Sequence, residues 1–267
     1  MPADDPEQQR LDRQHRLFKD LLNGRILLAP VNLKEGDAVL ETGTGTGAWL
    51  VDLASSVDPS VQMVGVDIEP RLFPVEAPKN ISFHMNTVLN LPAEWTNKFT
   101  LVHQRLLMVA LRTAEWPQAL SEMHRVLRPG GWVQIAESST WPVDAYPGRP
   151  SMEKLVALMR ALLEERDIFV DCGRNMPTLL KDAGFVDVQQ ELPIQKLGKW
   201  AGESGVAMKE NVVNVFGGLK TPILRAGGYG IVASEAEYDA LVQKVDLEWD
   251  SVPGTVLQYY VCWARKL

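Results

Sequence analysis

The sequence predicts an α/β protein whose core is a doubly wound, mostly parallel sheet of seven strands. Short apolar segments alternate with amphipathic helices through the first half of the chain. The segment 61–66 carries no charged residue, which is typical of a strand covered on both faces. A glycine-rich loop joins the first predicted strand to a helix, as in ligand-binding α/β proteins.

The individual elements follow from periodicity and from turn residues. Strands are predicted at 37–41, 61–66, 81–85, 99–104, 132–137, 185–192 and 255–264. Helices are predicted at 8–22, directly behind the glycine loop, before the turn 129–131, and at 151–166 and 178–183. The long insert before the last strand holds one clear helix, which a capping box of Ser234 and Glu237 begins.

We expect residues 1–267 to form a single domain with three parts. An N-terminal helical segment spans 1–30, a cofactor-binding half spans 31–138, and an acceptor-side half spans 139–267. Within the last part, residues of about 195–253 are too many for a hairpin loop and predict a helical cap over the ligand site.

Composition excludes several classes of function. The net charge of −7 and the absence of long Lys or Arg runs argue against nucleic acid as a partner. Two distant cysteines predict neither a disulfide framework nor a metal site. The acidic N-terminus does not resemble a signal peptide, and no apolar run is long enough for a membrane span. We therefore expect a cytoplasmic protein with a small-molecule partner; the oligomeric state is not predicted.

The stretch VLETGTGTGAWLVDLA (residues 39–54) points to a cofactor site. Its glycines lie between a strand and a helix, and Asp67 ends the next predicted strand, where it can accept ribose hydroxyls. This arrangement fits NAD, FAD or S-adenosylmethionine. The spacing G-T-G-T-G differs from the G-x-G-x-x-G of dinucleotide sites, and Glu41 suits an ammonium by charge pairing.

Four segments resemble successive motifs of class I S-adenosylmethionine-dependent methyltransferases: VLETGTGTGAW, VGVDIEP, FTLVHQR and EMHRVLRPGGW. The N-terminal segment RLDRQHRLFKDLLNGRILLAP and the insert resemble one fungal branch of secondary metabolism, which includes relatives of the regulator LaeA. The resemblance implies a Rossmann-like methyltransferase fold, S-adenosylmethionine as cofactor, S-adenosylhomocysteine as product, and no metal.

The resemblance also implies which residues bind the cofactor. The methionine end would lie against Glu41, Gly43, Thr44 and Gly45. Asp67 would bind the ribose, with Ile68 packing on the adenine. The family commonly has an aspartate after the third strand, and here Asn86 or Thr87 would take its place.

Three further residues are candidates for contact with the reacting groups. His103 ends the fourth predicted strand, where it would act as a catalytic base, contact the cofactor, or serve only as a structural residue. Glu137 ends the fifth strand, where it would contact the acceptor or lie in solvent. His15 recurs in the family's N-terminal helix, which can lie over the cofactor; the alternative is an exposed helix residue.

Large apolar and aromatic side chains in the loop and insert predict an acceptor pocket for a flat, apolar molecule. These residues are Trp141, Tyr146, Trp200, Met208 and Phe216. The alternative is that they only seal the cap onto the sheet.

The predicted function is methyl transfer by in-line displacement to a small-molecule acceptor, with oxygen expected as the methylated atom. One alternative keeps the fold without methylation, either as a cyclase-like enzyme or as a regulatory partner. The other is a nicotinamide-dependent dehydrogenase, which the glycine spacing disfavours.

Overall fold

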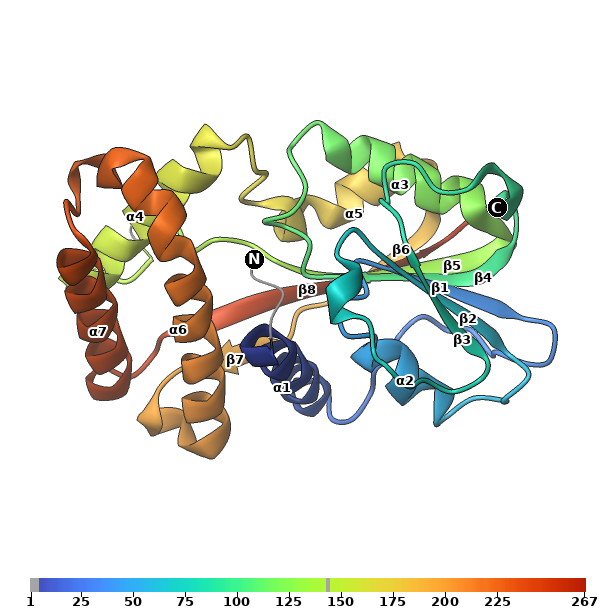
Figure 1. Cartoon of the computed structure of the whole chain (residues 1–267), viewed down its shortest axis with the longest axis horizontal. Helices are drawn as coiled ribbons and strands as arrows, with labels where there is room; N and C mark the ends of the chain where they lie inside the picture. Colours follow the sequence, from blue (N-terminus) through green and yellow to red (C-terminus); the bar gives the residue numbers. More distant parts are fainter. Residues whose placement is uncertain (1–4, 143–144) are drawn as a thin grey trace.

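The computed structural model describes residues 5–142 and 145–267 of the chain (Figure 1). Its strands are β1 (Ala38–Thr42), β2 (Gln62–Asp67), β3 (Ile81–Met85), β4 (Phe99–Arg105), β5 (Leu127–Ser138), β6 (Val186–Glu191), β7 (Ile194–Lys196) and β8 (Val256–Arg265). Its α-helices are α1 (Asp5–Leu21), α2 (Ala48–Ala54), α3 (Glu115–Val126), α4 (Pro150–Glu165), α5 (Cys172–Asp182), α6 (Gly202–Arg225) and α7 (Glu235–Ser251).

The strands form one sheet in the order β3-β2-β1-β4-β5-β8-β6, with β7 paired to β8. Neighbouring strands from β3 to β5 are parallel, whereas β8 runs antiparallel to β5, β6 and β7. The order reverses direction at β1, which places the chain's crossing point between β1 and β4. Ligands of open α/β sheets bind at this point, beyond the carboxyl ends of the strands.

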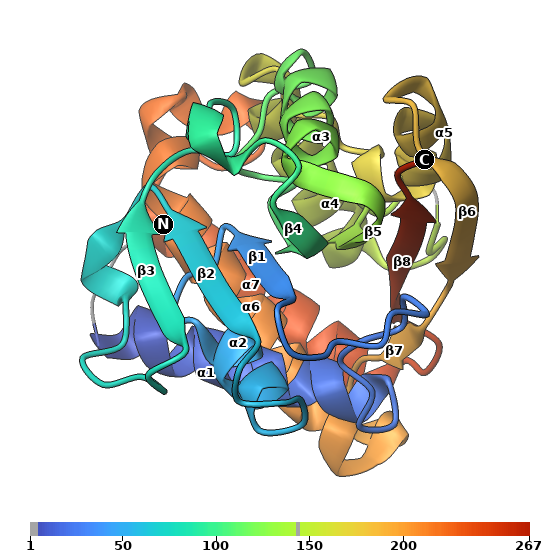
Figure 2. The same cartoon turned by 90° about the vertical axis from the view of Figure 1, so that its right-hand side faces the viewer.

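Helices cover both faces of the sheet, as the doubly wound prediction requires. Helices α3 and α5 pack on one face, and α1 and α2 lie on the other (Figures 1 and 2). The continuous apolar strands are buried between these layers, because both faces are covered. Leu40, Val102 and Ile135 have no exposed surface on one side of the core, and Val39 and Leu101 have none on the other.

A second group of helices, α4, α6 and α7, lies beyond the carboxyl ends of the parallel strands (Figure 1). These helices, which we call the cap, share a hydrophobic core that includes Met152, Phe216 and Trp249. An ion-pair cluster ties α6 to α7, since Lys209 Nζ lies 2.7 Å from Asp246 and 2.9 Å from Asp250. The cap is therefore a packed unit with its own core.

The predicted fold class is confirmed, with differences in detail. The described part of the chain has an eighth strand, β7, which is too short to predict from periodicity. Strand β5 begins at Leu127, earlier than predicted. The insert holds two long helices, and α6 was missed because Gly205, Gly217 and Pro222 disguise its apolar stripe. Helix α7 begins as predicted, with the Ser234 hydroxyl accepting from Glu237 N–H at 3.2 Å.

The cap core offers a test of its stability. Trp249 is fully buried against Trp141 and Phe216, so Trp249→Ala should lower the free energy of unfolding by about 3–5 kcal/mol. Leu247 lies on the same helix but is 58% exposed, so Leu247→Ala should change it by less than about 0.5 kcal/mol. Urea unfolding measures both, and equal effects would contradict a packed cap core.

Candidate active site

The glycine loop is a tight turn at the carboxyl end of β1. Gly43 and Gly47 have φ of 64° and 71°, which side chains other than glycine rarely adopt. A Cβ at Gly43 would lie 2.6 Å from Leu107 Cδ2, and one at Gly47 would lie 2.5 Å from Phe83 Cζ. The Thr44 N–H donates to Val66 O at 3.0 Å and holds the loop against β2. Only glycine fits these positions without displacing neighbours.

Glu41 is a buried acid at the base of this loop. The Thr44 hydroxyl donates to one carboxylate oxygen at 2.5 Å, and His103 Nδ1 lies 3.2 Å from the other. Burial raises the pKa of Glu41 to about 7, although the Thr44 hydrogen bond and the charge of Arg105 oppose that rise. The Glu41 carboxyl group therefore titrates near neutral pH, and a cationic partner would stabilise its ionised form.

His103 is enclosed rather than open to an acceptor. Its ring stacks on Trp49 with centroids 3.7 Å apart and planes 6° from parallel, and only 2% of the residue is exposed. Burial and the charge of Arg105 lower its pKa well below the usual value, so the ring is neutral and its Nδ1–H can donate to Glu41. This placement suits a residue that orients Glu41. A catalytic role for His103 stays a prediction that this geometry does not favour.

Asp67 and Ile68 lie where the sequence predicts them, at the end of β2. The Asp67 carboxylate accepts from Gly45 N–H at 2.8 Å and from Glu69 N–H at 3.0 Å, which links the second strand to the glycine loop. Ile68 is 72% exposed, so its side chain is available to pack on a flat ligand. Both residues therefore lie at the carboxyl edge of the sheet, beside the glycine loop.

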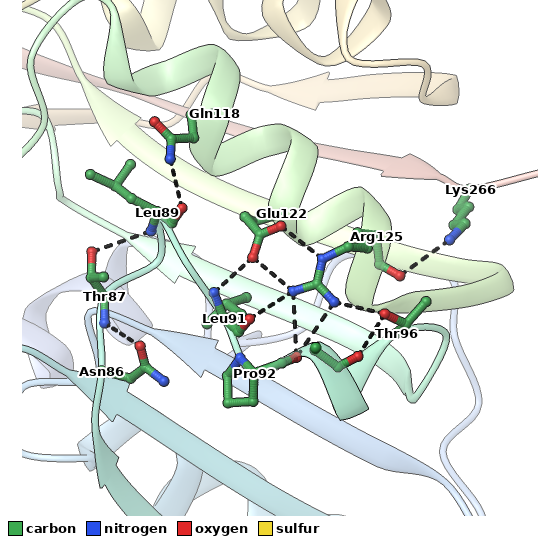
Figure 3. Close-up of polar contacts among 11 residues, drawn as sticks. Asn86, Thr87, Leu89, Leu91, Pro92, Thr96, Gln118, Glu122, Arg125 and Lys266 are labelled. Atoms are coloured by element: carbon green, nitrogen blue, oxygen red, sulfur yellow. Dashed lines mark hydrogen bonds and ion pairs between the residues drawn. The ribbon is translucent and has the colours of Figure 1, made fainter.

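Asn86 and Thr87 begin the connection after β3, beside Asp67. The Asn86 N–H donates to Asp67 O at 2.9 Å, and the Asn86 side-chain oxygen accepts from Thr87 N–H at 2.7 Å. Figure 3 shows how α3 fixes the following residues: Glu122 accepts from Leu91 N–H at 2.7 Å. Arg125, held by Glu122, donates to Leu91 O and Thr96 Oγ1 (Figure 3). The segment after β3 is therefore rigidly held.

Helix α1 packs against the glycine loop through polar contacts. The Thr46 hydroxyl donates to Asp12 at 2.7 Å, and His15 Nε2 lies 3.0 Å from Asp52 of α2. The other ring nitrogen of His15 faces Arg105, whose two terminal nitrogens lie 3.4 Å away. His15 is thus buried, contrary to an exposed helix residue, and it belongs to the wall of the site. Its contact with the cofactor stays a prediction.

Glu137 lies in the interior, not in solvent and not toward an open pocket. Its two carboxylate oxygens accept from Leu107 N–H at 2.7 Å and Met108 N–H at 3.2 Å. Burial raises its pKa to about 8, and these backbone hydrogen bonds counteract that rise only in part. The residue braces the turn after β4, which contradicts the alternative of a solvated strand end; its contact with the acceptor stays a prediction.

The predicted acceptor residues belong mainly to the cap interior. Trp141, Tyr146, Met208 and Phe216 pack into or against the cap core. The Trp141 indole N–H and the Tyr146 hydroxyl both donate to Val256 O, at 2.7 and 3.0 Å. Trp200 lies in the short turn Lys199–Ala201 before α6. This packing corresponds to the alternative in which these residues seal the cap, and their role as an acceptor pocket stays a prediction.

A cavity of about 570 Å³ lies elsewhere, between α1, β7 and α6. Its walls include Leu17, Asp20, Ile194, Lys196 and Glu203.

No group of three His, Cys, Asp or Glu side chains within 5–142 and 145–267 could hold a metal ion. Across the same ranges, no helix has the length and apolar character that crossing a membrane requires.

Comparisons with known proteins identify the family. A sequence profile described as a methyltransferase domain matches residues 39–131. The N-methyltransferase gliN of Aspergillus fumigatus is 30% identical over 98% of this chain and 94% of its own length. The chain belongs to the class I S-adenosylmethionine-dependent methyltransferases. The N-methyltransferases tcpN of Claviceps purpurea and sirN of Leptosphaeria maculans are 30% and 27% identical over 97% and 98% of this chain.

Solved structures share the fold of this methyltransferase. Phosphoethanolamine N-methyltransferase 2 of Haemonchus contortus, in complex with S-adenosyl-L-methionine, matches 97% of this chain and 52% of its own, with a TM-score of 0.53 and 17% identity. The [4+2]-cyclase SpnF matches 97% of this chain and 94% of its own, with a TM-score of 0.54 and 15% identity. Family membership sets aside the dehydrogenase alternative, while the narrower likeness to relatives of LaeA stays a prediction.

The residues at the carboxyl edge fit S-adenosylmethionine. The tight glycine loop brings backbone close to the edge, the buried acid Glu41 faces it, and Ile68 offers an exposed apolar surface. Arg105 was not among the site residues predicted from the sequence. The signal was present, because a cation directly follows the predicted strand 99–104 at the same edge.

The ribose assignment of Asp67 is testable. Asp67→Ala removes a double acceptor at the end of β2 and should weaken S-adenosylhomocysteine binding about tenfold or more, measured by calorimetry. Glu76 is an exposed acid in the connection that follows β2, and Glu76→Ala should leave the dissociation constant unchanged. Equal dissociation constants for Asp67→Ala and wild type would mean that the ribose is held elsewhere.

The raised pKa of Glu41 predicts a pH-dependent affinity. Below pH about 7 the buried acid of the free protein is protonated, and pairing with an ammonium requires its ionised form. Affinity for S-adenosylhomocysteine should therefore fall as the pH is lowered from about 8 to about 6, with proton release on binding. Calorimetry in two buffers of different ionisation enthalpy measures both.

The matched variant is Glu41→Gln, which keeps the side chain's shape but cannot ionise. It should bind more weakly at pH about 8 and lose the pH dependence that Glu41 causes. A wild-type affinity that stays constant across this pH range would contradict the assignment of Glu41 as the partner of the ammonium.

Proposed function

We propose that this methyltransferase methylates a nitrogen atom of a small-molecule acceptor. The observation that carries the proposal is the series of relatives named N-methyltransferases, gliN, tcpN, sirN and verN, which align with 97–98% of this chain. The sequence alone led us to expect oxygen as the methylated atom. These names favour nitrogen instead, and oxygen becomes the alternative that the assay distinguishes.

The geometry at the carboxyl edge is consistent with a nitrogen acceptor. A neutral amine attacks with its lone pair and can lose its proton after the methyl group has been transferred. A phenol or an alcohol generally requires a base first. His103, predicted as a possible base, and Glu137, predicted as a possible contact of the acceptor, are buried and engaged with Glu41 and with backbone N–H groups. Alignment and exclusion of water are then the chain's main contributions.

Each part of the structure has a defined task in this proposal. When bound, S-adenosylmethionine supplies an activated methyl group for in-line displacement. Glu41 and Asp67 hold the two ends of the cofactor's polar portion, and the rigid segment beginning at Asn86 borders the adenine side. The cap lies beyond the carboxyl ends of the strands, so the acceptor would be enclosed between the cap and the glycine loop (Figure 1).

A panel of acceptors tests the choice of atom. Purified protein with S-adenosylmethionine should release S-adenosylhomocysteine with molecules that carry an amine nitrogen, and mass spectrometry should place the methyl group on nitrogen. Phenols, carboxylic acids and thiols of similar size should give little product. Asp67→Ala at subsaturating cofactor is the control, because it should lower turnover of every acceptor by the same factor. Methylation of phenols without methylation of nitrogen would overturn the proposal.

A further inference from the structure

Arg105 lies beside the glycine loop, and within residues 5–142 and 145–267 no carboxylate forms an ion pair with its guanidinium. It is the last residue of β4, two positions after His103, and side chains two apart lie on the same face of a strand. His103 is the register partner of Glu41 in β1, so Arg105 lies one step further toward the carboxyl edge than this pair. The residue is thus placed beside the loop and next to the buried acid.

The contacts of Arg105 leave its charge uncompensated. Two of its nitrogens lie 3.4 Å from His15 Nδ1, a long contact to a ring whose pKa is lowered by burial and by Arg105 itself. The guanidinium also lies over the ring of Phe18, with Cζ 5.2 Å from its centroid. Among the residues that the structure places, no carboxylate forms an ion pair with it.

An unpaired cation in such surroundings points to an anionic ligand. Burial lowers the pKa of Arg105, while the charge of Glu41 opposes that change. A charge that is shielded from water and has no opposite charge beside it is unfavourable. A guanidinium with free N–H donors matches the planar geometry of a carboxylate, which would supply that opposite charge. Glu41 and Arg105 feel each other's charge but are not in contact, so an anion and a cation face the same edge.

The pair is complementary to a zwitterion of the α-amino-acid type. Such a group carries one ammonium and one carboxylate close together, and the methionine portion of the cofactor has this form. We propose that Arg105 binds the carboxylate of that methionine portion while Glu41 binds its ammonium. This inference rests on the cofactor of the methyltransferase family, but not on nitrogen as the methylated atom.

Residues of α1 hold the guanidinium in place for this task. His15 accepts from it through Nδ1 and is fixed in turn by Asp52 of α2, at 3.0 Å from Nε2. Phe18 covers its face from the next turn of the same helix. Helix α1 therefore contributes to the cofactor site by orienting Arg105, and His15 acts as a positioning residue.

A cycle of ligands and variants tests the proposal by calorimetry. In wild type, S-adenosylhomocysteine should bind about tenfold or more tightly than its decarboxylated analogue, since a charge-assisted contact is lost. Arg105→Gln should reduce this preference to about threefold or less, mainly by weakening the first ligand. Asp67→Ala should weaken both ligands and leave the preference unchanged.

Arg174→Gln is the matched control, because it removes one exposed arginine on α5 that pairs with Asp171. It should reproduce the wild-type preference. An Arg105→Gln protein that keeps the full preference overturns the proposal, and this is also the result expected if Arg105 served an anionic acceptor instead. If that variant fails to fold, the wild-type protein still tests the proposal: equal affinities for S-adenosylhomocysteine and its decarboxylated analogue would overturn it. Absence of nitrogen methylation would leave this binding result untouched.

Discussion

The burial of Glu41 is the constraint on which the carboxyl edge of this sheet depends. A carboxylate with 4% exposure must be hydrogen-bonded or neutralised, and the chain supplies Thr44 from the glycine loop and His103 from the neighbouring strand. The first contact fixes the loop, and the second requires a neutral ring that Trp49 of α2 covers. One buried acid therefore connects the loop, two strands and a helix.

The charged and polar groups around Glu41 also include residues of α1. Arg105 partly offsets the negative charge of Glu41 without touching it, and His15 links Arg105 to Asp52. These polar contacts add to the hydrophobic cluster in which Phe18 and Leu22 pack on the sheet, whereas α3 and α5 pack on the opposite face mainly through an apolar core. Polar packing on the ligand side leaves charges available, at a cost in intrinsic stability.

The sequence predicted the sheet, and the edge at which the candidate cofactor residues lie, because both depend on local patterns. Uncharged runs such as 61–66 mark buried strands, and polar residues at strand ends, such as Asp67, meet at one edge by the geometry of parallel strands. The resemblance to the methyltransferases implied that Ile68 and Asn86 lie at that edge, and the structure has them there. Their contacts with a cofactor remain predictions.

Partners from distant parts of the chain could not be predicted in this way. The enclosure of His103 depends on Trp49, and the two oxygens of Glu137 are taken by the turn at Leu107, which periodicity does not reveal. From the sequence, the large apolar residues of the loop and insert fit an acceptor pocket and the packing of the cap equally well. The sequence does not decide between the two because glycines and Pro222 obscure the apolar stripe of α6. The residue types at strand ends can be found from short stretches of sequence, whereas the burial of a side chain depends on which distant segments pack against it.

The division between sheet and cap bears on how the acceptor is chosen. The candidate cofactor residues lie at strand ends whose positions are fixed by the sheet, while the cap has a separate core centred on residues such as Trp249. Glu41 and Asp67 lie outside this core, so changes inside the cap need not disturb them. In the proposed transfer to nitrogen, which depends on alignment more than on a base, selectivity among acceptors would rest on the side chains that the cap turns toward the strand ends.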